Sequence, residues 1–385
     1  MASYTLRRMD RRSAIKAIGI LAGTAAMEAC ASKHVGQAAL PAPPLPSPLL
    51  KLPKVNVQPD REIRTVVGLR PFRPSGFVLA DQKFDDKLVV HNYGHGGAGV
   101  TLSWGTGELA CRKVDAIEEK NVAVLGCGAV GVATARLLQE RGRNVTIYAK
   151  DLPPNTTSNI AGAQWFPVYV FRRGQTAPDF MPRFIEACHL ANRRYQLMVG
   201  ARYGIRWLPN YEMGADPIPE GGLRSFDSPI RDLVPEMRDL DAAENPFPFP
   251  HVRQFQTMLI EPNTYLPAML QDFRIAGGRI EVREVHNIAE LQTLPERVIV
   301  NCTGLGAKAL FGDEELTPIK GQLTFLLPQP EIQYCALAED LYMFPRSDGI
   351  ALGGTHEVGV WSLEPDLQAK QRIVAGQQKL FSEMR

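Results

Sequence analysis

The chain of 385 residues has few cysteines and no excess of charge of either sign. Its six cysteines are spread out without metal-ligand pairs, and Cys127 and Cys302 lie in apolar or glycine-rich surroundings, so neither a disulfide framework nor a metal site is predicted. Lysine and arginine number 43 against 41 for aspartate and glutamate, and no long basic run is interleaved with aromatic residues. Nucleic acid is therefore not an expected partner. A chain of this length can fill one large domain or two ordinary ones.

The N-terminal 60 residues differ from the remainder. Arg11 and Arg12 precede the uncharged run Ala17 to Met27, which is shorter than the roughly 20 apolar residues of a membrane span and suits a signal-peptide core. The paired arginines resemble a twin-arginine export signal, so residues 1–30 are predicted to direct the protein to the periplasm or cell envelope. The alternative is a basic leader that does not direct export, in which case the protein would be cytoplasmic. A membrane is an expected partner only if Cys30 is lipidated, and the proline-rich residues 31–60 are expected to be a linker.

Residues 89–107, VVHNYGHGGAGVTLSWGTG, carry glycines in a short turn before a predicted helix. Gly94, Gly96, Gly97 and Gly99 free the backbone to take positive φ values and to lie against a flat ligand. The helix expected over Val100 to Leu109 would aim free N–H groups and a positive dipole end at that ligand. Such an end suits a group that gains negative charge during reaction, for example a reduced flavin. The alternative is a glycine-rich hairpin without a ligand.

Two further segments have the composition of ligand sites. In residues 68–74, GLRPFRP, prolines stiffen the backbone around Arg70, which favours bidentate capture of a carboxylate by its planar guanidinium group. In residues 122–131, VAVLGCGAVG, an apolar strand, a tight turn and a helix start form the dinucleotide-binding fingerprint in its usual context. Asp151 follows the next predicted strand and is the candidate for binding the ribose; an ordinary surface aspartate is the alternative.

Together these segments resemble the D-amino acid oxidase family of FAD-dependent oxidoreductases. The run His91-Asn92-Tyr93-Gly94 before paired glycines resembles its signature, although Gly107 stands where the family usually has alanine. The resemblance implies FAD as cofactor and Thr156, Thr157 and Ser158 as candidates for binding its pyrophosphate. The full set of implied FAD-binding residues is Gly96, Gly97, Ala98, Gly99, Val100, Thr101, Gly126, Gly128, Ala129, Val130, Gly131, Asp151, Thr156, Thr157, Ser158, Gly162 and Ala163.

The same resemblance implies oxidation of a D-amino acid. Arg70 and Tyr342 would hold the carboxylate, the Gly97 carbonyl would accept a hydrogen bond from the amino group, and hydride would pass to flavin N5. Molecular oxygen would then take the hydride from the flavin as hydrogen peroxide, and water would hydrolyse the imino acid to a 2-oxo acid and ammonia. Since no general base is needed for a neutral amine, His91 and His95 are expected to be structural.

Several alternatives stay open. Ala338 stands where mammalian members have a second active-site tyrosine, and His356 stands where D-aspartate oxidases have an arginine. D-aspartate oxidase activity, glycine oxidase-like activity and flavin binding without turnover are therefore kept as alternatives. Pairing of two copies into a homodimer is also left open.

The resemblance covers residues 61–375, but in a different order. Family members begin with the fingerprint strand and end with the arginine segment and the His-Asn-Tyr-Gly run, which here come first. The predicted fold class is α/β, with a Rossmann-like FAD-binding domain interleaved with an α+β substrate domain in circularly permuted order. Residues 61–175 are predicted to hold FAD-binding elements, 176–290 mainly the substrate domain, 291–312 the return of the FAD-binding domain, and 313–385 substrate-domain strands and a terminal helix.

Permutation has two geometric consequences. Arg61 should lie close to Glu383, because family members run directly from the terminal helix into the strand before the arginine segment. Arg70, Gly97 and Tyr342 should converge on one pocket.

The first prediction concerns the glycine turn of the fingerprint. Because the pyrophosphate must approach this backbone closely, Gly128→Val should clash with it and lower the FAD content of the purified protein. Flavin absorbance per mole of protein measures this, and an unchanged content would contradict the assignment.

Overall fold

The computed structural model describes residues 48–162 and 164–385. The predicted export signal, Cys30, most of the predicted linker and Ala163 lie outside these residues. Within the described part, no helix combines the length and the hydropathy that a membrane crossing requires. The five cysteines in this part are buried and unpaired, and no group of three or more His, Cys, Asp or Glu side chains there could hold a metal ion.

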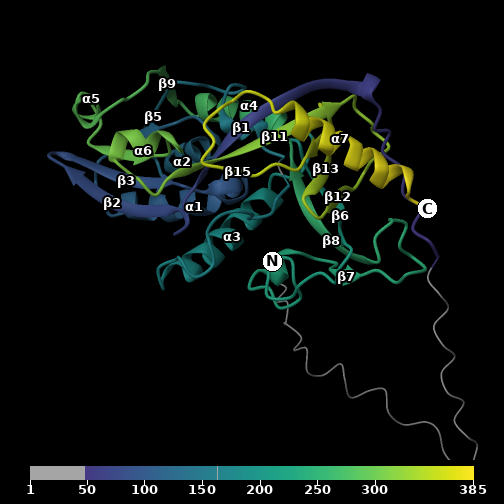
Figure 1. The fold of residues 1–385 in the computed structure, drawn as a ribbon. Helices are drawn as coiled ribbons and strands as arrows, with labels where there is room; N and C mark the ends of the chain where they lie inside the picture. Colours follow the sequence, from purple (N-terminus) through teal and green to yellow (C-terminus); the bar gives the residue numbers. More distant parts are fainter. Residues whose placement is uncertain (1–47, 163) are drawn as a thin grey trace, which may run out of the picture. The chain divides into compact units, whose positions relative to one another are not determined.

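One sheet is parallel apart from its first strand (Figure 1). Its strands lie in the order β2 (Val78–Phe84), β3 (Lys87–Tyr93), β10 (Val298–Asn301), β4 (Asn121–Leu125), β5 (Asn144–Ala149) and β9 (Arg279–Val282). Val122 and Val124 of β4 pack with α1 (Gly99–Asp115) and α2 (Ala129–Glu140). Ala123 and Leu125 face the opposite side, with side chains of α5 (Ile288–Gln292) and α6 (Gly306–Phe311). Burial on both faces explains the unbroken apolar run of this strand.

The larger sheet is antiparallel except where β12 pairs with β6. Its order is β1 (Glu62–Phe72), β11 (Thr317–Leu326), β14 (Gly349–Gly353), β13 (Leu341–Arg346), β12 (Cys335–Ala338), β6 (Ile205–Gly214), β8 (His251–Ile260) and β7 (Arg238–Asp239), with β15 (Glu357–Val358) also pairing with β11. The helix α7 (Leu367–Ser382) covers one face, where Met343 packs with Phe381. Phe344 points to the opposite face and packs with Leu337. Alternate residues of β13 thus serve two different apolar clusters.

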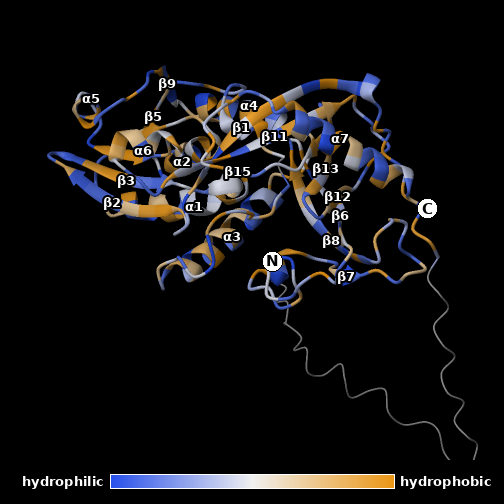
Figure 2. Ribbon diagram, viewed as in Figure 1, coloured by the Kyte–Doolittle hydropathy of each residue, from blue (hydrophilic) through white to orange (hydrophobic). Residues whose placement is uncertain are grey.

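Other segments cover the remaining surfaces. Helix α3 (Phe180–Gln196) packs against α1, and α4 (Pro262–Ile275) against α2. The described residues also form four short 3-10 helices: η1 (Pro59–Arg61), η2 (Gly96–Ala98), η3 (Thr157–Ile160) and η4 (Arg231–Leu233). Figure 2 shows the polar tip of the β2–β3 hairpin in blue, where it projects from the apolar core.

Two predicted elements differ from the structure. The strand predicted to end before the arginine segment continues through Arg70 to Phe72, so Arg70 lies in a strand and not in a turn. Pro71 is tolerated there because β1 is the edge strand of the larger sheet. The helix predicted over Val100–Leu109 continues to Asp115, which shortens the connection to β4 to residues 116–120.

The boundary residues also differ from expectation. Strand β1 belongs to the larger sheet, although residues 61–175 were expected to hold FAD-binding elements. Glu62 pairs with Lys370 near the start of α7 at 2.7 Å, so Glu383 lies about 20 Å of helix further on and Arg61 is not its neighbour. The N-terminal part of the described chain and its C-terminal end approach each other at other residues, near Leu50 and Arg385. The amides of Leu50 and Arg385 donate to the carbonyls of Glu244 and Pro246, at 2.9 and 2.8 Å.

Candidate active site

A cavity of about 1290 Å³ lies between the two sheets. Residues at or just after the carboxyl ends of the parallel strands line one side of it, as ligand sites of open α/β sheets do. These residues are Tyr93 and Gly96 after β3, Gly126 to Gly128 after β4, Lys150 and Asp151 after β5, and Cys302 to Gly304 after β10. The other side is the face of the larger sheet that carries Leu337, Tyr342 and Phe344.

The glycines of the fingerprint turn have different roles. Gly126 has φ +103°, and a Cβ atom on Gly131 would lie 2.1 Å from the Gly126 carbonyl oxygen, so both allow close backbone packing. A Cβ atom on Gly128 would meet only the Ser158 Oγ, at 3.0 Å, and Gly128 lines the cavity. The Ser158 Oγ accepts a hydrogen bond of 2.9 Å from the Ala129 amide at the start of α2. Ser158 and the N-terminus of α2 therefore lie together at the predicted pyrophosphate position.

The second glycine segment, residues 94–99, also packs closely against another segment of the same chain. A Cβ atom on Gly96, which has φ +57°, would lie 1.8 Å from the Tyr169 carbonyl oxygen. The same carbonyl accepts a hydrogen bond from the Gly97 amide at 3.3 Å. The turn can therefore expose backbone to the cavity only without side chains at these positions.

Most of the predicted FAD-binding residues line this one cavity. Gly131 and Ala98 do not line it, because Gly131 packs on the turn and Ala98 is buried beside it. Asp151 lines the cavity and is exposed, while its neighbour Lys150 pairs with Glu284 at 3.4 Å. The long cavity, its glycine edges and the N-terminus of α2 fit a dinucleotide cofactor with an anionic pyrophosphate.

The two predicted carboxylate donors lie flat on the larger sheet. A Cβ atom on Gly321 would come within 2.3 Å of an Arg70 guanidinium nitrogen, and one on Gly353 would come within 2.1 Å of the Tyr342 ring. Gly353 is paired in register with Tyr342, so the ring lies over the neighbouring strand. Burial raises the pKa of Tyr342, and the positive charge of Arg70 opposes that shift. Arg70 forms no ion pair within the described residues, but donates weakly to the Thr355 carbonyl at 3.4 Å.

Tyr169 and His356 form a second wall of this region. Their ring centroids are 4.3 Å apart at an angle of 38°. Burial, followed by the positive charge of Arg70, lowers the pKa of His356 to about 4. The imidazole is therefore neutral near pH 7 and offers no cation to an acidic side chain. Tyr169 was not predicted, because no sequence motif brings its segment against His356.

A charged pair at the cavity, Arg224 and Glu212, was also not predicted from the sequence. Arg224 lines the cavity, donates to Glu212 at 3.3 Å and lies 4.7 Å from the centre of the Phe166 ring. Glu212 is paired in register with Leu337, which is paired with Tyr342. Side chains directly paired across a sheet share a face, so Glu212 lies two strands, or about 10 Å, from Tyr342 on the cavity face.

Both histidines of the glycine segment hold protein partners. His91 contacts Gln82 at 3.2 Å, and His95 contacts Thr106 at 2.8 Å. Burial lowers the pKa of His91 to about 4 and of His95 to about 3. Each hydrogen bond holds its ring in a structural position.

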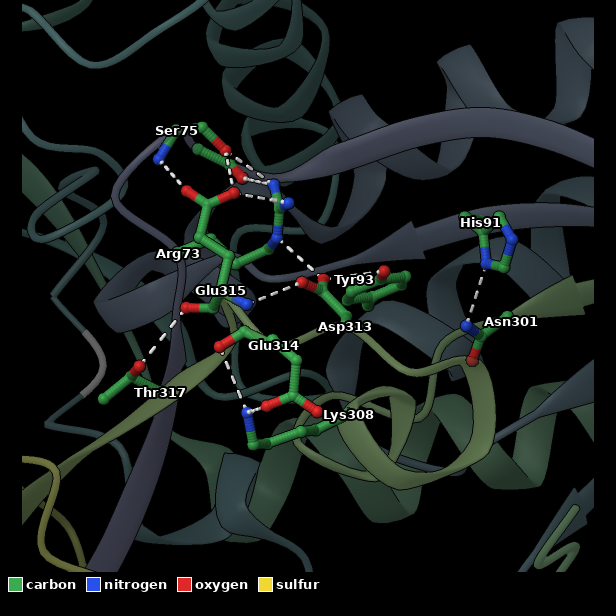
Figure 3. Close-up of polar contacts among 11 residues, drawn as sticks. Arg73, Ser75, His91, Tyr93, Asn301, Lys308, Asp313, Glu314, Glu315 and Thr317 are labelled. Atoms are coloured by element: carbon green, nitrogen blue, oxygen red, sulfur yellow. Dashed lines mark hydrogen bonds and ion pairs between the residues drawn. The ribbon is translucent and has the colours of Figure 1, made fainter.

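An ion cluster joins the two sheets beside the cavity (Figure 3). Arg73 follows β1 and contacts Asp313 at 2.8 Å and Glu315 at 2.6 Å, both before β11. Tyr93 at the end of β3 donates to the same Asp313 at 2.8 Å. The strand that carries Arg70 is thereby fixed to the strand that leads into Gly96.

The sequence from residue 121 onward identifies the protein family. Residues 121–385 match the model of the DAO family, described as FAD dependent oxidoreductase. This chain belongs to that family. The predicted resemblance is confirmed, FAD is the cofactor, and the protein is an oxidoreductase of the amino acid oxidase type.

Individual relatives agree with this assignment. A D-amino-acid oxidase of Streptomyces coelicolor is 32% identical over 269 residues, which cover 68% of this chain and 78% of that protein. A D-aspartate oxidase of Homo sapiens is 26% identical over 67% of this chain and 75% of its own length. The FAD-bound structure of L-alpha-glycerophosphate oxidase from Mycoplasma pneumoniae shares the fold alone, with a TM-score of 0.51 and 15% identity over 70% of this chain and 80% of that chain.

The glycine beneath Tyr342 provides a test of the donor geometry. Gly353→Ala should lift the Tyr342 ring and weaken its hydrogen bond to a bound carboxylate, which lowers kcat/KM by roughly 10- to 150-fold without loss of FAD. Tyr342→Phe should cause a similar loss. The double variant should lose little more than either single variant, because both changes remove the same bond. Additive losses would contradict this explanation.

Proposed function

We propose that the protein is an FAD-dependent oxidase of D-amino acids, which yields a 2-oxo acid, ammonia and hydrogen peroxide. The observation that carries this proposal is the pair Arg70 and Tyr342, two donors that lie over glycines in the cavity that Gly97 also lines. Arg70 has no acidic partner of its own among the described residues, so its guanidinium group is available for a carboxylate. Family membership supports a flavin reaction in the same cavity.

The residues would orient the substrate rather than take part in covalent chemistry. Arg70 and Tyr342 would donate to the carboxylate, and the Gly97 carbonyl would accept from the amino group. Bound FAD supplies the hydride acceptor, which molecular oxygen reoxidises. Fixing the carboxylate and the amino group in this way would leave only one enantiomer with its α-hydrogen directed at the hydride acceptor. No histidine needs to remove a proton when the amine is neutral, which agrees with the protein partners of His91 and His95.

Acidic D-amino acids are a second candidate, since Arg224 lines the cavity and a D-aspartate oxidase is among the relatives. Two observations weigh against this candidate. Arg224 already pairs with Glu212, and the low pKa of His356 leaves it neutral where an acidic side chain would need a cation. We therefore favour neutral side chains.

A panel of amino acids with peroxide detection tests the proposed function. Both enantiomers of alanine, leucine, phenylalanine and aspartate should be supplied to the FAD-loaded protein, together with glycine. Oxidation of neutral D-amino acids is expected. Turnover of L-enantiomers alone would overturn the proposal, and a preference for D-aspartate would favour the second candidate.

We also infer that the chain is a circular permutant of the family order. The family match begins at residue 121, while β1 and β3 precede it and pair with β11 and β10 of the matched region. Leu50 and Arg385 bind carbonyls two residues apart, within the reach of a linker of a few residues at about 3.3 Å each.

Reordering the chain tests this inference. A protein that begins at Asn121, continues through Arg385 and a short linker into Leu50, and ends at Lys120 should fold, bind FAD and keep its activity. The same linkage opened inside α2 at Leu137, which is buried, should fail and serves as the control. Loss of FAD binding in the first protein would contradict the permutation.

Arg70 provides the direct test of the carboxylate anchor. Removal of one partner of a buried charge pair costs about 2 to 5 kcal/mol, so Arg70→Ala should lower kcat/KM by roughly 30-fold to several thousand-fold with FAD still bound. Arg64→Ala is the matched control, since Arg64 lies on the same strand but pairs with Asp348 outside the cavity. Equal kinetics of the two variants would move the anchor elsewhere.

A further inference from the structure

Tyr169 has a backbone conformation that is unfavourable for a tyrosine. Its φ is +53°, a left-handed value that costs a residue with a Cβ atom about 1 to 2 kcal/mol. Four residues other than glycine have positive φ in the described part of the chain: Asp85, Tyr169, Glu236 and Glu339. Asp85 occupies the β2–β3 turn and lies outside the cavity, whereas Tyr169 lines it. Strain of this kind gathers at functional sites.

The backbone of Tyr169 is held by contacts that do not involve its side chain. Its carbonyl accepts from the Gly97 amide, and the missing side chain of Gly96 makes room for that carbonyl. Nearby, the Arg172 amide donates to the Pro74 carbonyl at 2.8 Å. Glycine would satisfy the same backbone contacts without strain, so the local fold gives no reason for a tyrosine here.

The side chain of Tyr169 is directed at the cavity. One part of its ring packs on His356, yet 46% of the residue is exposed, and its hydroxyl has no hydrogen-bond partner within the described residues. It lies near enough to Tyr342 for the two phenols to interact electrostatically. The ring thus stands beside the carboxylate donors with an uncovered surface.

Strands β12 and β13 contain no tyrosine other than Tyr342. Ala338, at the end of β12, belongs to the apolar cluster on the α7 side of the sheet. A side chain at that position would therefore point away from the cavity. The segment that contains Tyr169 and contacts the turn at Gly96 and Gly97 supplies an aromatic ring instead.

We infer that Tyr169 is a substrate-contacting residue whose ring, backed by His356, forms the wall for the substrate side chain and selects D-amino acids with large apolar or aromatic side chains. This inference rests on the proposed function for the identity of the substrate. Phe166, Leu337 and Phe344 extend the same apolar lining, while Arg224 at its edge is neutralised by Glu212. A side chain that stacks on the uncovered part of the ring gains the interaction of an aromatic pair.

Tyr169→Gly separates this role from a structural one. The variant removes the ring and relieves the strain, so its melting temperature and FAD content should be unchanged or higher. Its kcat/KM for D-phenylalanine should fall by roughly 2- to 13-fold more than for D-alanine, the ratio that corresponds to one aromatic pair. Tyr169→Phe keeps the ring and should keep the preference. Asp85→Gly relieves the same kind of strain outside the cavity and should leave the ratio unchanged.

Two outcomes would overturn the inference. Equal losses for both substrates would mean that the ring does not contact the side chain. A lower melting temperature or FAD content in Tyr169→Gly, repeated in Tyr169→Asn, would make the residue structural, since asparagine also tolerates this conformation.

A binding measurement keeps the result independent of turnover. The compound 3-phenylpropanoate is phenylalanine without its amino group, and propanoate is the same analogue of alanine. Titration of the flavin spectrum should give a 3-phenylpropanoate affinity that falls in Tyr169→Gly, with little change for propanoate. If the wild-type protein oxidises no D-amino acid but this difference persists, the proposed function fails and the role of Tyr169 stands. If the protein is active and the difference is absent, only the role of Tyr169 fails.

Discussion

The ion cluster around Arg73 connects the two sheets that form the walls of the cavity. Arg73 reaches Asp313 and Glu315 from the end of β1, and Tyr93 reaches Asp313 from the end of β3. Loss of one partner in such a partly buried group leaves charges that water cannot fully solvate, at a cost of about 3 to 5 kcal/mol when burial is complete. The cluster couples the strand that carries Arg70 to the turn that carries Gly96 and Gly97.

Absent side chains determine the geometry on both walls of the cavity. On the parallel sheet, Gly96 lets the Tyr169 carbonyl approach, and Gly131 lets α2 pack on the fingerprint turn. On the larger sheet, Gly321 and Gly353 let Arg70 and Tyr342 lie flat instead of standing upright. The first pair brings backbone groups to one wall of the cavity, and the second places the donors Arg70 and Tyr342 on the other wall. At each of these four glycines an added Cβ atom would lie 2.3 Å or less from a neighbouring atom, which close packing does not allow.

The chemistry expected here needs orientation more than acid-base groups. Burial keeps His91, His95 and His356 neutral near pH 7, and the first two hold protein partners. Arg70 lines the same cavity, and its positive charge adds to the effect of burial in lowering the pKa of His356. In the proposed function, a single carboxylate anchor next to a neutral, aromatic wall would distinguish substrates by the size and polarity of their side chains. Arg224 and Glu212 cancel each other's charge at the edge of this wall.

The sequence alone was sufficient for the cofactor segments, because their function depends on local order. A strand, a glycine turn and a helix start must be contiguous to bind a pyrophosphate, and residues 122–131 therefore identified the fold of that region and the cofactor. The extent of β1 could not be found in this way, since Pro71 is acceptable in a strand only at a sheet edge. That edge exists because β11, almost 250 residues later, supplies the pairing partner. The proximity of Leu50 to Arg385 could not be predicted for the same reason, because it depends on hydrogen bonds to carbonyls of the distant residues 244 and 246. Tyr169 and Arg224 carry no motif, and only the tertiary packing brings Tyr169 to His356 and Arg224 to the same cavity. Local contacts are encoded in adjacent residues, whereas the substrate wall is built from separate strands and loops and exists only once they have packed.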